Sequence, residues 1–214
     1  MQNLNAIVLG ATGATGKELV NLLLEDSHFN SVRIFVRKNP KISHKKLKIY
    51  KIDFSKIEDY KQLIKGDVLF SCLGTTLKTA GSKVKQYQVD YIYQYEFARY
   101  ASHNGVNMYS LVSSSGANSK SPFFYPKIKG QLEESVKKLP FQTIHILQPP
   151  MLIRQDELIR SGEKIVIKIL RRLNNLGILK SQKPLPVSVL ANRMIDEIKK
   201  HQQIKIKIFS SRNF

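Results

Sequence analysis

The stretch "IVLGATGATGKELV", residues 7–20, places three glycines at intervals of three between an apolar run and a mixed apolar and charged segment. Glycine destabilises the interior of both helices and strands, because it loses the most conformational freedom on folding. Its recurrence here therefore indicates a turn from a strand into a helix. Gly10 would permit the tight turn, Gly13 would let a ligand approach the backbone, and Gly16 would let the helix lie close to the strand.

The same change from strand to helix recurs along the chain. Apolar strand-like runs lie at 5–9, 32–36, 47–52, 67–72, 107–112 and 142–147. Helical stretches lie at 16–26, 56–64, 84–103 and about 126–138. Short apolar strands that alternate with helices indicate parallel pairing, with helices on both faces of the sheet. We therefore predict the α/β class with a doubly wound parallel sheet, a Rossmann fold.

After about residue 150 the alternation becomes less regular. A helix is predicted at 156–174, followed by the proline-bearing loop "SQKPLPVSVL", a helix at 188–200 and an alternating strand at 204–209. A chain of 214 residues suits one domain. We predict a single domain over 1–214, in which 150–190 forms a small C-terminal extension that covers the substrate side.

Composition narrows the class of protein. The hydrophobic fraction of 42% and charged fraction of 24% are typical of a soluble domain, and no apolar run is long enough for a membrane span. The N-terminus carries no signal core, which favours a cytoplasmic location. The single Cys72 and the five histidines lack the spacing of a disulfide or zinc site. We expect neither a disulfide nor a bound metal.

The formal net charge of +19 has two interpretations. It can indicate binding to nucleic acid or to an anionic surface, with dense basic stretches at 37–51 and 160–175. It is equally explained by a lysine-rich composition spread along the chain. The basic stretches lack the interleaved aromatic residues of a nucleic-acid surface, so nucleic acid is the disfavoured partner.

The glycine-rich turn, placed in the first strand-to-helix connection, predicts a dinucleotide site. The free N–H groups and the positive dipole end of the following helix favour phosphate there. The next strand, in "VRIFVRKN", ends without the acidic residue that holds the ribose of NAD; Arg37 and Lys38 follow it instead. We therefore predict NADP(H), with Arg37 on the 2′-phosphate. A chance basic residue in a lysine-rich chain is the alternative, which leaves NAD possible.

The candidate chemistry lies after the fifth strand, in "SLVSSSGA" and "FFYPKIKG". Carbonyl reduction needs an acid that protonates the oxygen, and a tyrosine can serve if a nearby cation lowers its pKa. Tyr125 and Lys129 are four residues apart, so they share one face of a helix. Ser114 is the first choice for holding the carbonyl, with Ser113 and Ser115 as open alternatives. Because Pro126 restricts the residue before it, we expect Tyr125 at the helix cap.

Several segments together resemble a known family. The G-x-x-G-x-x-G spacing resembles the extended and atypical short-chain dehydrogenase/reductases. With "FSCLGTTLKTAGS", "VDYIYQYEFARYASHNGV", "LVSSSGANSKSPFFYPKIKGQLEESV" and "ILQPPMLI", residues 5–155 resemble the atypical members of the Tat-interactive-protein type. The tyrosine and lysine match the position of that family's active-site pair.

The resemblance implies a Rossmann-fold protein, monomeric or homodimeric, that binds NADP(H). Ser114, Tyr125 and Lys129 match the family's catalytic serine, tyrosine and lysine. Asp53, after the third strand, matches the acid that relatives place near the adenine. The cofactor contacts that we predict from the turn and the resemblance together are Gly10, Thr12, Gly13, Ala14, Thr15, Gly16, Arg37, Lys38, Asp53, Cys72, Leu73, Gly74, Lys129 and Pro149.

Two functions follow from these patterns. The first is an NADP(H)-dependent oxidoreductase that reduces a small carbonyl substrate through a serine, tyrosine and lysine site. The second is an NADP(H)-binding regulatory or redox-sensing protein with little catalytic activity. The substrate and the direction of the reaction stay open, because fold does not fix function.

Overall fold

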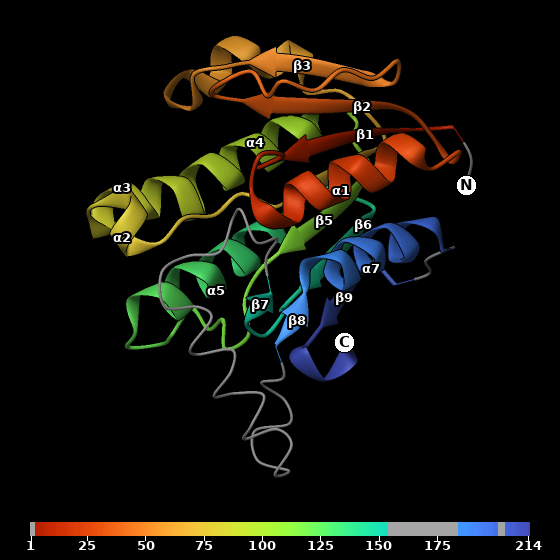
Figure 1. Ribbon diagram of the computed structural model, residues 1–214. Coiled ribbons are helices and arrows are strands. Elements are labelled where there is room, and N and C mark those ends of the chain that lie inside the picture. The colour runs from red at the N-terminus through yellow and green to blue at the C-terminus, as the bar shows by residue number, and fades with distance from the viewer. Residues whose placement is uncertain (1–2, 154–183, 201–203) are drawn as a thin grey trace.

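The computed structural model describes residues 3–153, 184–200 and 204–214. They form a seven-stranded parallel sheet in the order β3-β2-β1-β4-β5-β6-β9 (Figure 1). The strands are β1 (Leu4–Leu9), β2 (Phe29–Val36), β3 (Leu47–Lys51), β4 (Val68–Ser71), β5 (Met108–Val112), β6 (Thr143–Leu147) and β9 (Ile206–Phe209). The predicted doubly wound α/β fold is confirmed.

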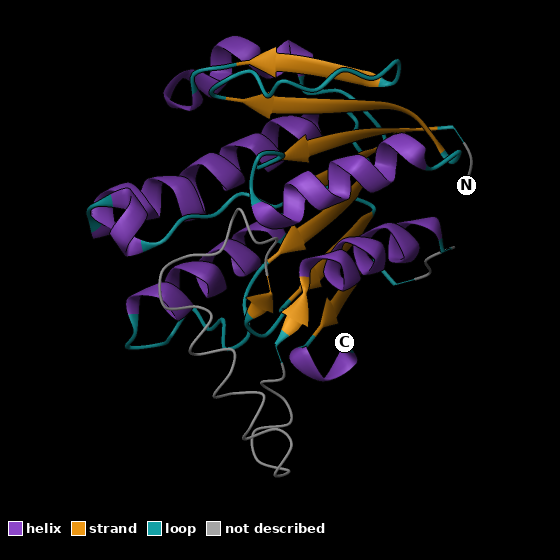
Figure 2. Ribbon diagram, viewed as in Figure 1, coloured by secondary structure: helices purple, strands orange, loops and turns teal. Residues whose placement is uncertain are grey.

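Helices connect most of the strands (Figure 2). They are α1 (Ala14–Glu25), a 3₁₀ helix (Phe54–Leu63), α2 (Leu77–Ala80), α3 (Lys83–Tyr87), a π-helical turn (Gln88–Ile92), α4 (Tyr93–His103), α5 (Phe124–Val136), α7 (Val187–Lys199) and a terminal 3₁₀ turn (Ser211–Asn213). The long helix predicted at 84–103 is therefore interrupted by the π-helical turn, which changes the face that its first turns present.

The C-terminal third is described only in part. The short strands β7 (Leu152–Ile153) and β8 (Leu185–Pro186) pair in parallel, apart from the main sheet. The predicted helix at 156–174, and most of the predicted extension at 150–190, lie outside the described residues. The predicted helix at 188–200 and strand at 204–209 correspond to α7 and β9.

Two apolar cores lie on opposite faces of the sheet, and β1 contributes to both. Ala6 and Val8 belong to the core that contains α1 and α7. Ile7 and Leu9 belong to the core that contains α4 and α5. Successive strand residues point to opposite faces, so a strand covered on both sides is continuously apolar. This explains why the first strand reads as an unbroken hydrophobic run.

The strand order reverses between β1 and β4. From β1 the chain adds β2 and β3 on one side of the sheet, and it then adds β4, β5, β6 and β9 on the other side. A crevice opens outside the carboxyl ends of the strands at such a switch point, and ligands of open α/β sheets bind there. The glycine-rich turn follows β1, and "CLGTT" follows β4. The fold therefore brings these two segments together at the switch point.

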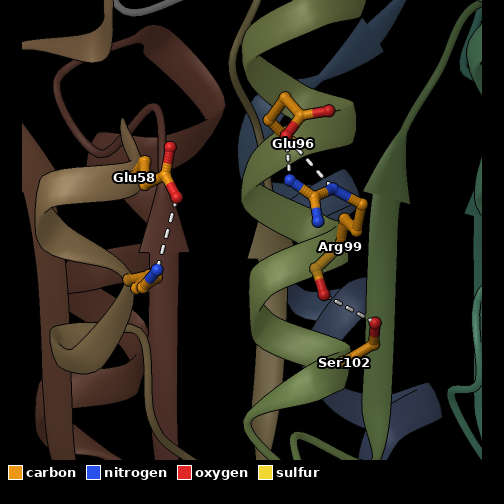
Figure 3. A network of polar contacts seen from close by, with 5 residues as sticks. Glu58, Glu96, Arg99 and Ser102 are labelled. Atoms are coloured by element: carbon orange, nitrogen blue, oxygen red, sulfur yellow. Dashed lines mark hydrogen bonds and ion pairs between the residues drawn. The ribbon is translucent and has the colours of Figure 1, made fainter. Parts of the chain in front are cut away.

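The helical surfaces carry local ion pairs. On α4, Arg99 Nε donates to Glu96 at 3.1 Å, and Ser102 Oγ donates to the Arg99 carbonyl at 2.8 Å (Figure 3). Lys61 pairs with Glu58 at 3.3 Å on the neighbouring 3₁₀ helix. Exposed pairs of this kind contribute little to stability. They satisfy acidic groups locally and leave the excess of lysines facing solvent.

A more buried ion pair joins the ends of α1 and α7. Asp26, which ends α1, pairs with Lys199, the last residue of α7, and accepts a hydrogen bond from the His28 amide at 2.9 Å. Burial alone would raise the pKa of Asp26, but the hydrogen bonds from Lys199 and His28 outweigh it and lower the pKa to about 2. The ionised carboxylate therefore stabilises the contact between α1 and α7.

We expect Asp26→Asn to lower the free energy of unfolding by about 2 kcal/mol at neutral pH. A depressed carboxyl pKa stabilises the folded state above the unfolded pKa, and that stability is lost as pH falls through the folded pKa. The difference from wild type should therefore shrink between about pH 4 and pH 2, measured by urea unfolding. Glu58→Gln, at a carboxylate whose side chain is 70% exposed, is the control and should change stability little. An equal loss in both variants would contradict the assignment.

Candidate functional site

The glycine-rich turn closes tightly against the end of β4. Gly10 has a φ of +81°, and a Cβ at this position would stand 2.5 Å from the backbone nitrogen of Leu73. A Cβ on Gly16 would stand 2.2 Å from the carbonyl oxygen of Gly10. Neither position has space for a side chain. The first glycine therefore permits the turn and its contact with β4, and the third lets α1 begin directly over the turn.

The middle glycine is different, because it faces open space. Gly13 is the exposed N-cap of α1, and the nearest atom to an added Cβ is the Gly10 carbonyl oxygen at 3.4 Å. With Ala14 and Thr15, Gly13 lines a cavity of about 540 Å³. Thr12 is exposed and lies outside this lining. The start of α1 thus borders the cavity, where a helix dipole favours an anion.

Residues from six separate parts of the chain line this first cavity, Leu152 of β7 among them. Its wall is formed by the turn before α1, the segment after β4, one face of α3, and the segments around β5 and α5. The residues that line it are Gly13, Ala14, Thr15, Cys72, Leu73, Gly74, Thr75, Thr76, Leu77, Lys83, Gln86, Val112, Ser113, Phe124, Tyr125, Lys129 and Leu152. The predicted tyrosine and lysine therefore share one cavity with the glycine-rich turn.

Tyr125 lies within the first turn of α5, and this corrects the expectation that Pro126 would hold it at the cap. The cap is Phe123, and the helix begins at Phe124. Proline fits the first turn because the N–H groups there have no intrahelical acceptor. The helix therefore starts before the Tyr-Pro pair. Tyr125 is 41% exposed at the cavity.

Lys129 is buried beneath the same cavity. Its side chain is 2% exposed, and Nζ donates to the Val112 carbonyl at 3.2 Å. One helical turn separates it from Tyr125. The neighbouring Cys72 is partly buried at the cavity wall; burial raises the pKa of its thiol to about 12, although the charge of Lys129 opposes this shift. The thiol is therefore protonated at neutral pH.

The three serines after β5 are placed differently. Ser113 lines the cavity, is buried, and donates its hydroxyl proton to Glu133. Ser114 lies outside the lining, and its hydroxyl donates to the Ser115 carbonyl at 3.2 Å. The amide of Gln148 donates to both oxygens of Glu133, at 3.1 and 3.0 Å. A buried carboxylate thus ties the ends of β5 and β6 to α5.

A second cavity, of about 1080 Å³, adjoins the first. Both are lined by Leu73, Gly74 and Thr75, so the segment after β4 forms their shared wall. Arg37, the first residue after β2, lines the second cavity together with Lys51 and Lys85. The two cavities together follow the carboxyl edge of the sheet from β3 to α5.

Of the three remaining predicted residues, Asp53 lines a cavity, whereas Lys38 and Pro149 lie outside both linings. Asp53 lines the second cavity and accepts from the Ser55 hydroxyl at 2.7 Å and the Ser55 amide at 2.9 Å, which together lower the pKa of its carboxyl. It therefore also caps the 3₁₀ helix. Lys38 is exposed and outside both linings. Pro149 is buried, and its carbonyl accepts from the Ser115 amide at 2.9 Å.

One organising carboxylate was missed by the sequence analysis. Asp90, 1% exposed in the π-helical turn, accepts from the Thr75 amide at 3.2 Å. The backbone carbonyl of Asp90 accepts from Gln94 at 2.9 Å, and Gln94 accepts from Ser71 at 2.8 Å. This chain of contacts fixes the "CLGTT" segment against the π-helical turn that follows α3. The combination of "CLGTT" with a following "VD" was the available signal, but spacing alone could not show the contact.

Within the described ranges, no cluster of histidine, cysteine or acidic side chains could hold a metal ion. The same ranges contain no helix long and apolar enough to cross a membrane.

Comparison with known proteins agrees with this geometry. Residues 10–155 match the family described as NAD(P)H-binding. The chain is 35% identical over 196 residues to protein FMP52-1, mitochondrial, of Scheffersomyces stipitis, covering 88% of this chain and 81% of that protein. It is 33% identical over 172 residues to protein HTATIP2 of Rattus norvegicus, covering 78% and 71%.

A solved structure shows the same fold. A short chain dehydrogenase family protein from Francisella tularensis superposes with a TM-score of 0.69, over 99% of this chain and 98% of that one, at 17% identity. With the two sequence relatives, it supports the atypical short-chain dehydrogenase/reductase type that the motifs predicted.

The relatives also correct one expectation. The Scheffersomyces protein and further fungal relatives are named mitochondrial, which contradicts the predicted cytoplasmic location. The prediction rested on the absence of a signal core at the N-terminus. Targeting signals are addresses read by receptors, so the fold carries no trace of them.

Gly16 and Gly13 have different roles in the glycine-rich turn: the first permits close packing, and the second leaves space for a ligand. Substitution can test each role. We expect Gly16→Ala to lower the free energy of unfolding by about 2 to 3 kcal/mol, because its Cβ would overlap the Gly10 carbonyl. Gly13→Ala should change stability by less than about 1 kcal/mol but weaken NAD(P)H binding at least about tenfold, because the methyl group would stand at the cavity. Chemical unfolding and nicotinamide fluorescence measure the two effects. Unchanged binding in Gly13→Ala would contradict the role of this turn.

Proposed function

Since the chain belongs to the NAD(P)H-binding family, we propose that it is an NADP(H)-dependent oxidoreductase that reduces a small carbonyl compound. The observation that carries the proposal is the sharing of one cavity by Tyr125, Lys129 and the start of α1. A proton donor, a buried cation and a phosphate-favouring helix end thus border the same space.

The donor set along the two cavities fits an NADP(H) molecule. Gly13 leaves the start of α1 open to a pyrophosphate, and the shared wall at Leu73–Thr75 leads into the second cavity. Arg37, Lys51 and Lys85 on that cavity provide positive charge for a 2′-phosphate. Asp53 is the acid facing them, and its bonds to Ser55 hold it at the helix cap.

When bound, the cofactor supplies or accepts a hydride. The chain's own residues would manage the proton and the charge. Tyr125 would donate its hydroxyl proton to the carbonyl oxygen, and solvent reaches this partly exposed side chain to restore the proton. Lys129, held against the Val112 carbonyl, would stabilise the tyrosinate that remains.

The serine role is better supported at Ser113 than at the predicted Ser114, because Ser113 lines the cavity and Ser114 does not. The Ser113 hydroxyl donates its proton to the Glu133 side chain. Toward a ligand, Ser113 would therefore accept a hydrogen bond. Tyr125 is then the donor to the substrate carbonyl.

Replacement of Tyr125 by phenylalanine should lower turnover of an active carbonyl substrate by at least about a hundredfold, because the proton donor is lost. NADPH affinity should stay nearly unchanged. In the same assay, Ser113→Ala should reduce turnover more than Ser114→Ala. Steady-state kinetics and an NADPH titration measure these effects. Full activity in Tyr125→Phe would contradict the proposed site, whereas NADPH binding without turnover of any carbonyl by wild type would favour the regulatory alternative.

The cofactor preference has its own test. We expect Arg37→Ala to weaken NADPH binding by about tenfold to a hundredfold while NADH binding is unchanged, because only NADPH carries the 2′-phosphate. Lys38→Ala is the matched control, since this adjacent basic residue is exposed and outside the cavity lining. Thermal melting with each nucleotide measures the preference. Equal loss of NADPH and NADH binding in Arg37→Ala would contradict the phosphate role.

A further inference from the structure

We propose that Lys83 and Gln86 form a carboxylate-binding subsite in the first cavity, so that the substrate is a carbonyl compound that also carries a carboxylate. The inference rests on the proposed reductase function and adds the substrate class. Both residues belong to α3, are three positions apart and therefore share one helical face. Both line the cavity that contains Tyr125.

The burial of Gln86 at the cavity wall supports the subsite more strongly than the charge of Lys83 does. Its side chain is only 3% exposed, yet it lines the cavity. Among the described residues, no protein group hydrogen-bonds the side-chain amide of Gln86, whereas its backbone N–H donates to the Ser82 carbonyl at 2.9 Å. A side-chain amide at a cavity wall that has no hydrogen bond to a described protein group can donate to a ligand in the cavity. A ligand acceptor in the cavity would supply the missing hydrogen bond.

Lys83 adds a positive charge beside this amide. Its Nζ lies 5.6 Å from the centroid of the Phe124 ring, so the ammonium lies beside the start of α5. No ion pair between Lys83 and another described residue competes for it. Lys83 and the proposed proton donor Tyr125 line the same cavity. A lysine and an amide donor together match the oxygens of a single carboxylate.

The π-helical turn that directly continues α3 is held by the contacts of Asp90 described above. Asp90 in the π-helical turn holds the Thr75 amide, and Thr75 lines the same cavity. The π-helical turn follows Gln86 almost directly, at Gln88–Ile92, and such turns often accompany functional sites. The face of α3 that carries Lys83 and Gln86 is therefore held over the cavity.

The rest of the wall restricts the ligand further. Leu77, Val112 and Leu152 give the cavity an apolar side. One lysine balances one negative charge, which suits a monocarboxylate better than a phosphate dianion. An oxo acid with an aliphatic body would place its carbonyl at Tyr125 and its carboxylate at α3. The positive charge of the whole chain would also attract such an anion.

Binding is tested first, without catalysis, on the full chain saturated with NADP⁺. A chain-length series of straight-chain oxo acids is titrated against the matching methyl esters, and affinity is read by calorimetry. We expect at least one acid to bind about tenfold more tightly than its ester, with a preference that falls as salt is raised. No preference for any acid over its ester would overturn the subsite.

Two variants test whether the preference for the acid over its ester depends on α3. Lys83→Met keeps the aliphatic stem and removes the charge, and Gln86→Met removes the amide from the buried side chain. Each should reduce the preference for the acid about tenfold while leaving NADP⁺ affinity unchanged. Lys78→Met, at an exposed lysine of α2 outside the cavity lining, removes the same charge and should leave the preference intact. An equal effect in Lys78→Met and Lys83→Met would assign the preference to net charge and overturn the subsite.

The two proposals fail in different ways. If an acid binds through Lys83 but NADPH is not oxidised in its presence, the subsite stands and the reductase function fails. If an ester and its acid are reduced with equal kcat/KM by wild type and by Lys83→Met, the reductase function stands and the subsite is overturned. A loss of NADP⁺ binding in Gln86→Met and Lys83→Met alike would instead assign both residues to the cofactor.

Discussion

The structure depends on the close approach of two backbone segments at the centre of the sheet. The turn after β1 touches the end of β4, and the first turn of α1 rests on the turn itself. No side chain larger than hydrogen fits at Gly10 or Gly16. This contact fixes where the crevice opens and directs the start of α1 toward it. Both cavities border the segment after β4 that the contact holds.

Buried polar contacts connect the strands at the centre of the sheet to the helices that border the site. Ser71, Gln94 and Asp90 connect β4 to the helix that begins with α3, and Asp90 also holds the Thr75 amide. On the other side, Glu133 joins Ser113 and Gln148 to α5. Buried polar networks of this kind stabilise one arrangement when every member is satisfied. The two networks therefore hold the π-helical turn after α3, and α5, beside the first cavity.

The basic residues that border the two cavities account for part of the positive net charge of the chain. Arg37, Lys51 and Lys85 border the second cavity, and Lys83 and Lys129 border the first. These basic groups lie where the proposed cofactor and substrate would carry their negative charge. Many other lysines are on the exposed surface, where opposite charges pair only locally and contribute little. The lysine-rich composition and a local use of lysine in the site are thus both present.

The sequence by itself determined the fold and indicated the edge of the sheet at which we propose that the cofactor binds. Continuous apolar strands alternating with helices allow few other topologies, and the glycine spacing marks the first turn, because these signals are local. The tertiary structure decided which neighbouring side chains meet. Ser113 and not Ser114 lines the cavity, Tyr125 lies inside the helix despite Pro126, and Gln86 is buried at the cavity wall. These outcomes depend on the direction of individual side chains and on partners far away in the chain, such as Glu133 and Asp90, which no local pattern encodes.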